Sequence, residues 1–132
     1  MRDSLKAHIN ISGDFLVQDI REMIGERTTI DIHCEKGVIV EKGRFAGELS
    51  KTSMINVYAP QKMNQRYHDQ IEYLLKKAFR VLHHSTKLQL WVLYEYEHQC
   101  NLEFTPQQLK KLGELNIPLL ISCWQKKPSI RI

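Results

Sequence analysis

Six histidines and three cysteines are the side chains best able to bind a metal in this chain of 132 residues. Zinc sites usually need short spacings such as Cys-x-x-Cys, or two histidines one helical turn apart. His83 and His84 are neighbours, and on a helix their side chains would point about 100° apart. His33 and Cys34 are neighbours on an expected strand, where they would face opposite sides. We therefore expect neither a metal site nor a bound cofactor.

A nucleophilic cysteine needs a thiolate and a nearby base. Cys100 lies close to His98 in an expected turn, and this pair is the best candidate of its kind. Cys34 and Cys123 fall on inward-facing positions of expected strands, where a thiol is commonly inert. No serine elbow and no glycine-rich phosphate loop occurs in the sequence.

Two further arrangements of polar residues could support acid–base chemistry. Asp31 and His33 form a possible acid–histidine pair on one strand. Glu95 and Glu97 lie two residues apart and would share one face of another strand. Exposed strand faces often carry such pairs without any activity, so we expect no catalytic residues.

The stretch from Asn64 to Glu97 predicts a long helix followed by a strand, and it organises the remaining elements. Its apolar residues first recur at steps of three and four, and after a polar turn at residues 83–87 they alternate. The helical stripe consists of Ile71, Leu74, Leu75, Ala78, Phe79 and Leu82. The strand positions are Leu88, Leu90, Val92, Tyr94 and Tyr96. A helix packed on a sheet has this pair of patterns.

The rest of the chain predicts three strands, two helices and an irregular region with a short strand. Strands are expected at residues 5–11, 28–34 and 119–124. Inside the uncertain region 35–60, residues 38–40 could form a short strand, and residues 45–49 and 54–58 could form two arms of strand or one strand with an irregular insert. A helix over 14–24 would begin with an N-cap at Ser12-Gly13-Asp14 and end at Gly25. Another would begin at Thr105-Pro106-Gln107-Gln108, which fits a capping box, and would bury Leu109 and Leu112. Asn64 could cap the long helix.

This order predicts an α+β fold, a two-layer ferredoxin-like sandwich. Its elements would run strand, helix, strand, strand, helix, strand, helix, strand. The helices would cover one face of a mostly antiparallel sheet, with a parallel crossover at the end. Residues 1–132 would form a single domain, and residues 125–132 a loosely ordered tail.

Composition indicates a globular chain. Hydrophobic residues make up 42% and charged residues 26%, and the formal net charge is +4. No apolar run approaches the ~20 residues of a membrane span. The first residues lack the apolar segment of a signal peptide, and the odd number of widely spaced cysteines favours a reduced compartment. We therefore expect a cytoplasmic location and no contact with a membrane.

The sheet face turned away from the helices is unusually apolar for a solvated surface. The expected contact residues are His8, Asp31, His33, Trp91, Leu93, Glu95, Glu97, Leu120 and Trp124. Large exposed apolar patches often mark interfaces, here with another protein or a second copy of the chain. The alternative is that segment 35–53 or the C-terminal tail covers this face.

Several turn and capping motifs resemble those of a known bacterial family. They are Ile9-Asn10-Ile11-Ser12-Gly13-Asp14-Phe15, Ile24-Gly25 with Thr28, Lys36-Gly37, Ile71-Glu72-Tyr73-Leu74-Leu75 and Phe104-Thr105-Pro106-Gln107-Gln108-Leu109. Together they resemble the bacterial domain of unknown function catalogued as four-two-seven-nine, over nearly the whole chain. The resemblance implies the α+β fold and supplies no catalytic residues. Small proteins of this build often serve as immunity proteins against bacterial toxins, and this is an analogy of fold.

Three functional hypotheses follow. The first is a non-enzymatic protein-binding module, and specifically an immunity protein that neutralises a toxin. The second is a single-stranded RNA-binding module that uses the outer sheet face, because Lys42-Gly43-Arg44-Phe45-Ala46 is similar to a basic, aromatic RNA-binding motif. The third is a small enzyme that uses Cys100 with His98, or Asp31 with His33.

Overall fold

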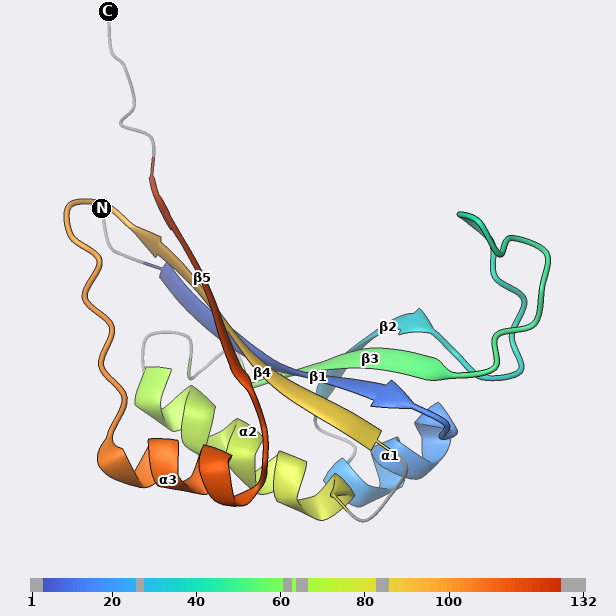
Figure 1. Ribbon diagram of the computed structural model, residues 1–132, viewed down its shortest axis with the longest axis horizontal. Helices are drawn as coiled ribbons and strands as arrows, with labels where there is room; N and C mark the ends of the chain where they lie inside the picture. The colour runs from blue at the N-terminus through green and yellow to red at the C-terminus, as the bar shows by residue number, and fades with distance from the viewer. Residues whose placement is uncertain (1–3, 26–27, 61–62, 64–66, 83–85, 127–132) are drawn as a thin grey trace, which may run out of the picture.

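The computed structural model describes residues 4–25, 28–60, 63, 67–82 and 86–126. The chain forms five strands and three helices in the predicted order among these residues (Figure 1). They are β1 (Ser4–Gly13), α1 (Val17–Ile24), β2 (Thr29–Cys34), β3 (Ser53–Tyr58), α2 (Tyr67–Val81), β4 (Thr86–Tyr96), α3 (Pro106–Glu114) and β5 (Leu119–Gln125).

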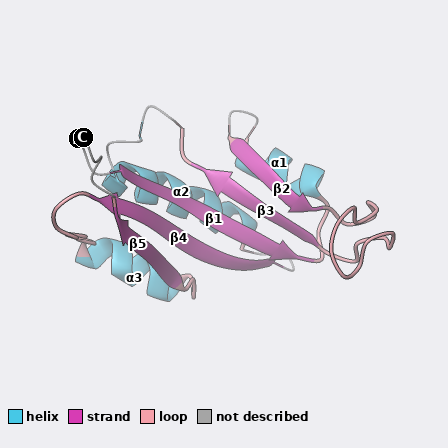
Figure 2. Ribbon diagram, turned by 90° about the horizontal axis from the view of Figure 1, so that it is seen from above, coloured by secondary structure: helices cyan, strands magenta, loops and turns pink. Residues whose placement is uncertain are grey.

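The strands form one mixed sheet with the order β2-β3-β1-β4-β5 (Figure 2). The first three neighbouring pairs are antiparallel, and β4 pairs with β5 in parallel. A parallel pair needs a crossover connection, which α3 supplies. The prediction of an α+β fold with a mostly antiparallel sheet and a closing parallel unit is therefore confirmed.

The core lies between the sheet and the helices, which Figure 1 shows below the strands. The almost fully buried strand residues are Ala7, Ile9, Ile11, Ile55, Val57, Leu90 and Val92. The helices contribute Ile20, Ile24, Ile71, Leu74, Leu75 and Ala78. Gln70 fastens α2 to β1, since its Oε1 accepts from the Ala7 N–H at 3.0 Å and its Nε2 donates to the Leu5 carbonyl at 3.2 Å. Because the Gln70 amide is buried, it needs these hydrogen bonds, and they fix the position of α2 relative to β1.

Of the three predicted helix caps on α1 and α3, two are found where the sequence predicts them. Thr105 and Gln108 form the predicted capping box at α3, with Pro106 in the first turn. Gly25 caps α1 with a φ of 95°, which favours glycine. The N-cap predicted at Ser12-Gly13-Asp14 is wrong, because α1 begins later and its N-cap is Leu16 without a side-chain hydrogen bond. The Asp14 carboxylate pairs with Lys36 instead.

Two helix residues predicted to be buried are exposed. Phe79 is 58% exposed, because it lies beyond the margin of the α2 stripe formed by Ile71, Leu75 and Ala78. Leu109 is 50% exposed, because the buried Gln108 takes the inward position next to it on α3.

Strand residues at the sheet edges are also less buried than predicted. Ile32 on β2 is 39% exposed, and Ile121 on β5 is 45% exposed. Cys34 is half-buried and Cys123 is exposed, so the expectation that both thiols are buried in the core is wrong. β2 and β5 are the two outermost strands of the sheet, so each has a neighbouring strand on one side alone.

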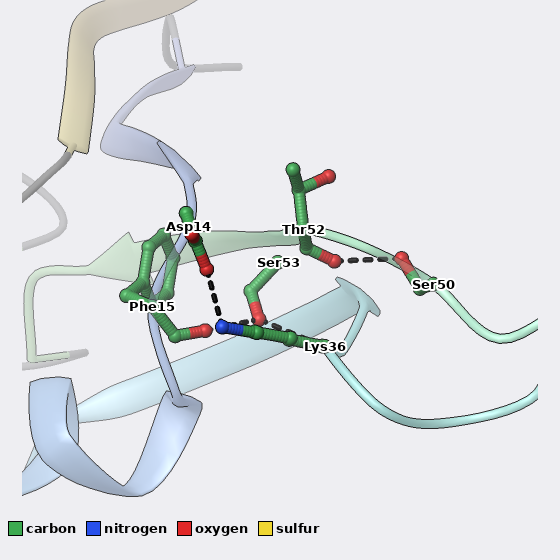
Figure 3. Close-up of polar contacts among 6 residues, drawn as sticks. All are labelled: Asp14, Phe15, Lys36, Ser50, Thr52 and Ser53. Carbon is green, nitrogen blue, oxygen red and sulfur yellow. Dashed lines mark hydrogen bonds and ion pairs between the residues drawn. The ribbon is translucent and has the colours of Figure 1, made fainter.

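Segment 35–52 extends beyond one end of the sheet and does not lie across it (Figure 1). The two ends of the segment are joined near the sheet by Ser53. The Ser53 hydroxyl accepts from the Lys36 N–H at 2.9 Å and donates to the Phe15 carbonyl at 2.8 Å (Figure 3). The strands suggested at residues 38–40 and 45–49 are reduced to one bridge between Ile39 and Leu49. The covering of the outer face predicted for residues 35–53 is therefore wrong.

Several predictions fall on residues outside the described part of the chain. The Asn64 cap and the His83–His84 pair belong to this group. The first two residues of the predicted loose tail are held in place, because Gln125 closes β5 and the Lys126 N–H donates to the Tyr96 carbonyl at 2.7 Å. Residues 127–132 are outside the described part. No helix among the described residues is long and apolar enough to cross a membrane.

Candidate interaction surface on the outer sheet face

Four apolar side chains gather on the outer face of β4 and β5. In the parallel register Trp91 lies beside Leu120, Leu93 beside Ser122, and Glu95 beside Trp124. We call Trp91, Leu93, Leu120 and Trp124 the tryptophan face. Trp124 is 44% exposed and the other three are half-buried. Figure 2 views the sheet from the side opposite the helices, and no described segment lies across these strands.

Hydrogen bonds at the ring edges fix both indoles. The Trp91 Nε1–H donates to Gln89 Oε1 at 3.1 Å, and the Trp124 Nε1–H donates to Glu95 Oε2 at 2.9 Å. Glu95 is held in turn by Lys126, with 3.6 Å between Oε1 and Nζ. An indole whose polar edge is satisfied offers a preorganised apolar surface to a partner.

The other half of the outer face carries a polar cluster on β1, β2 and β3. The Asn10 Nδ2–H donates to Asn56 Oδ1 at 2.9 Å, and Asn56 Nδ2 is 2.9 Å from His33 Nε2. We call Asn10, Asn56 and His33 the amide network. Asn56 is buried at 8% exposed, so its hydrogen bonds offset the loss of water.

His8 lies between the two halves on the central strand. Its ring centroid is 5.2 Å from that of Tyr58 and 6.4 Å from that of Trp91. His8 is 8% exposed, and its Nδ1 atom has no hydrogen-bond partner among the described residues. Burial, together with the charge of His33, lowers the pKa of His8. His8 therefore supports the face from within the sheet, and a partner would not reach its side chain directly.

The remaining predicted contact residues lie around this surface. Asp31 and His33 are exposed on the edge strand β2, separated from β4 by two strands. Glu97 follows the end of β4, and its carbonyl accepts from Gln125 Nε2 at 3.1 Å. The nine predicted residues thus share one side of the sheet or its rim, but they do not form one contiguous patch.

The described contacts engage both candidate catalytic histidines with other side chains. His33 Nε2 is engaged with Asn56, and His98 Nε2 is 3.8 Å from Glu97 Oε1. The described residues hold no group of three or more histidine, cysteine or acidic side chains that could bind a metal ion. Cys100 instead lies 3.5 Å from Cys123, measured between the two sulfur atoms.

Sequence reasoning missed a second surface, on the helical side of the molecule. Lys76, Phe79, Arg80 and Lys111 line a shallow pocket of about 350 Å³ between α2 and α3. Within the described part of the chain, none of the three cations forms an ion pair. Residues 61–132 contain 11 lysines and arginines but 6 acidic residues, and this excess of positive charge is the signal that indicates the cluster. The helical periodicity, in contrast, placed Phe79 in the core.

Comparison of this chain with family models, with curated proteins and with solved structures finds no match. The resemblance to the bacterial domain of unknown function therefore stays a prediction. The geometry of the outer face is the remaining basis for a functional proposal.

Proposed function

We propose that this chain is a non-enzymatic protein-binding module that uses the tryptophan face as its contact surface. The observation that carries the proposal is the pair of anchored, partly exposed tryptophans on a sheet face that no described segment covers. Tryptophan is enriched among the residues that dominate binding energy at protein interfaces. A rim of Glu95, Lys126 and the exposed Lys6 surrounds the apolar centre, as is usual for such interfaces.

The charges favour a protein over a nucleic acid as the partner on this face. The cationic cluster of Lys76, Arg80 and Lys111 lies on the helices. On the sheet side Lys126 is paired with Glu95, and Lys6 lies beside Leu93 at the rim of the tryptophan face. Phosphate contacts dominate the affinity of nucleic-acid binding, and they need such cations at the contact surface. The motif Lys42 to Ala46 lies in segment 35–52 outside the sheet, so Phe45 adds no aromatic ring to the outer face.

We also propose a finer classification of the fold, as a ferredoxin-like sandwich with one added strand. Four strands in the order β2-β3-β1-β4 are connected by α1 and α2 as in a ferredoxin-like sandwich, and β5 would be an addition at the edge next to β4. The partner class suggested by the family resemblance is a bacterial toxin domain, which would make the chain an immunity protein. This class is an analogy of fold and needs a test of its own.

Site-specific photo-crosslinking tests the contact surface. A photoreactive amino acid replaces Ser122, which lies between Leu120 and Trp124, and in a control chain it replaces the exposed Gln18 on α1. Irradiation in cells that express the chain naturally should give one specific adduct from position 122 and none from position 18. The captured protein is then purified and titrated with wild-type chain and with Trp124→Ala. Absence of a position-specific adduct, or equal affinity of both chains, would contradict the proposal.

A growth assay tests the narrower toxin-inhibitor idea. A toxin gene next to the gene for this chain is expressed with wild-type chain, with Trp124→Lys or with Gln18→Lys. We expect growth with the wild type and with Gln18→Lys, and growth arrest with Trp124→Lys. Equal rescue by all three chains would exclude the tryptophan face, and no rescue by the wild type would exclude that toxin as the partner.

A further inference from the structure

Two cysteine thiols that are far apart in the sequence meet at the surface. Cys100 follows β4 and Cys123 lies on β5, and both are exposed. Their sulfur atoms are 3.5 Å apart. The third cysteine, Cys34, is on β2, and its Sγ donates to the Thr52 carbonyl at 3.7 Å. The fold thus contains one thiol pair and one single thiol.

The backbone around the pair explains its proximity. Cys123 lies beside Tyr94 in the parallel register of β4 and β5. Beyond that point the Lys126 N–H donates to the Tyr96 carbonyl at 2.7 Å, and Gln125 Nε2 donates to the Glu97 carbonyl at 3.1 Å. These bonds hold the start of the segment after β4 against the end of β5. The separation exceeds a disulfide bond length by about 1.5 Å, which side-chain rotation can provide on an exposed surface.

We propose that Cys100 and Cys123 form a redox-active dithiol site that reacts with low-molecular-weight disulfides. In the first step the thiolate of one cysteine attacks a disulfide of the type RSSR, which gives a protein mixed disulfide and releases one RS⁻. In the second step the thiolate of the other cysteine attacks the protein sulfur of that mixed disulfide and releases the second RS⁻. The protein thiols lose two protons and two electrons, and RSSR is reduced to two RSH.

The bond would connect the segment between β4 and α3 to the edge strand β5. It closes a loop that contains α3, and such a crosslink restricts the unfolded chain more than the folded one. Cys34 cannot complete the second step, because no other cysteine contacts it among the described residues. It should stop at a mixed disulfide, so it is removed from the chains in which the pair is tested.

Intact-mass measurement after incubation with glutathione disulfide tests the proposal. All chains carry Cys34→Ser, so that the pair alone remains, and they are compared with the additional changes Cys100→Ser and Cys123→Ser. The pair should lose the mass of two hydrogen atoms and retain no glutathionyl group. Each single-thiol chain should instead gain one glutathionyl group. Retention of one or two glutathionyl groups by the pair, or an unreacted pair, would overturn the proposal.

A second measurement separates proximity in the fold from simple reactivity. The equilibrium constant for forming the intrachain bond is determined in native buffer and in denaturing guanidinium chloride at matched ratios of reduced to oxidised glutathione. The folded chain should favour the bond about 10-fold or more, since the structure holds the thiols together. Equal constants, or a smaller constant in native buffer, would contradict the arrangement of Cys100 and Cys123.

Discussion

The side chains on the two halves of the outer sheet face find their hydrogen-bond partners in different ways. On β1, β2 and β3, the polar groups of Asn10, Asn56 and His33 bind one another. On β4 and β5, Trp91 and Trp124 are satisfied at their N–H edges alone, and their ring surfaces stay partly exposed. Neighbouring strands of one sheet can therefore carry one region that stabilises the fold and another that is available for binding.

Substitutions in the two halves should therefore affect different free energies, that of unfolding in the polar half and that of binding in the tryptophan face. Removing a member of a buried polar network leaves its partners unsatisfied and lowers the free energy of unfolding. Removing an exposed aromatic ring costs the fold little but deprives a partner of an apolar anchor. The predictions below test this separation, beginning with the largest expected effect.

Replacing Trp124 by alanine should weaken binding of the crosslinked partner by about 2 kcal/mol or more, which is roughly 30-fold in the dissociation constant. The same change should lower the free energy of unfolding by less than about 1 kcal/mol, because the ring is partly exposed. Calorimetric titration and urea unfolding measure the two effects. Asp31→Ala, in the polar half, is the control and should leave the affinity within about threefold.

Replacing Asn56 by alanine should lower the free energy of unfolding by about 1–3 kcal/mol, because Asn10 and His33 lose their shared partner. Partner affinity should change little. Urea denaturation at neutral pH measures the loss of stability. A variant that is as stable as the wild type would mean that the amide network does not stabilise this half of the face.

The boundary residue His8 should make the stability depend on pH. Its pKa is lowered in the fold by burial and by His33, so the unfolded chain binds a proton before the folded chain does. The contribution of uncharged His8 to the free energy of unfolding is fully present above the ordinary histidine pKa of about 6.5. It is lost as the pH falls below that value, because the unfolded chain then takes up the proton more readily. His8→Phe should reduce the decline in stability between neutral and mildly acidic pH, as measured by thermal unfolding.

At neutral pH His8→Phe should stay within about 1 kcal/mol of the wild type, because the His8 Nδ1 atom has no hydrogen-bond partner to lose. An unchanged pH dependence in this variant would show that other groups cause the decline. His33→Gln is a useful comparison, since it removes the nearby charge and keeps a side chain able to bond Asn56.

The smallest effect should come from Phe79, the exposed aromatic ring on the helical side. Phe79→Ala should change the free energy of unfolding by about 0.5 kcal/mol or less, since the ring is 58% exposed. It should leave binding through the tryptophan face unchanged. A loss of affinity equal to that of Trp124→Ala would move the contact surface to the helices and to the cations around Phe79.

The order of elements was predictable because the apolar residues have clear periods and because Thr105 and Gln108 form a recognisable capping box. The outer positions of Trp91 and Trp124 followed from strict alternation along β4 and β5. Exposure at Ile121 and Cys123 was not predictable, since periodicity identifies a face but does not show how far a helix covers it. The contact of Cys100 with Cys123 depends on the path of a turn, which local patterns do not specify.

Acrylamide quenching of tryptophan fluorescence tests the central claim most directly. Trp91→Phe leaves Trp124 as the single tryptophan, and Trp124→Phe leaves Trp91. We expect that Trp124 in the free chain is readily quenched, that Trp91 is quenched less, and that partner binding protects both. Strong protection of Trp124 in the free chain, or unchanged quenching of both rings in the complex, would contradict it.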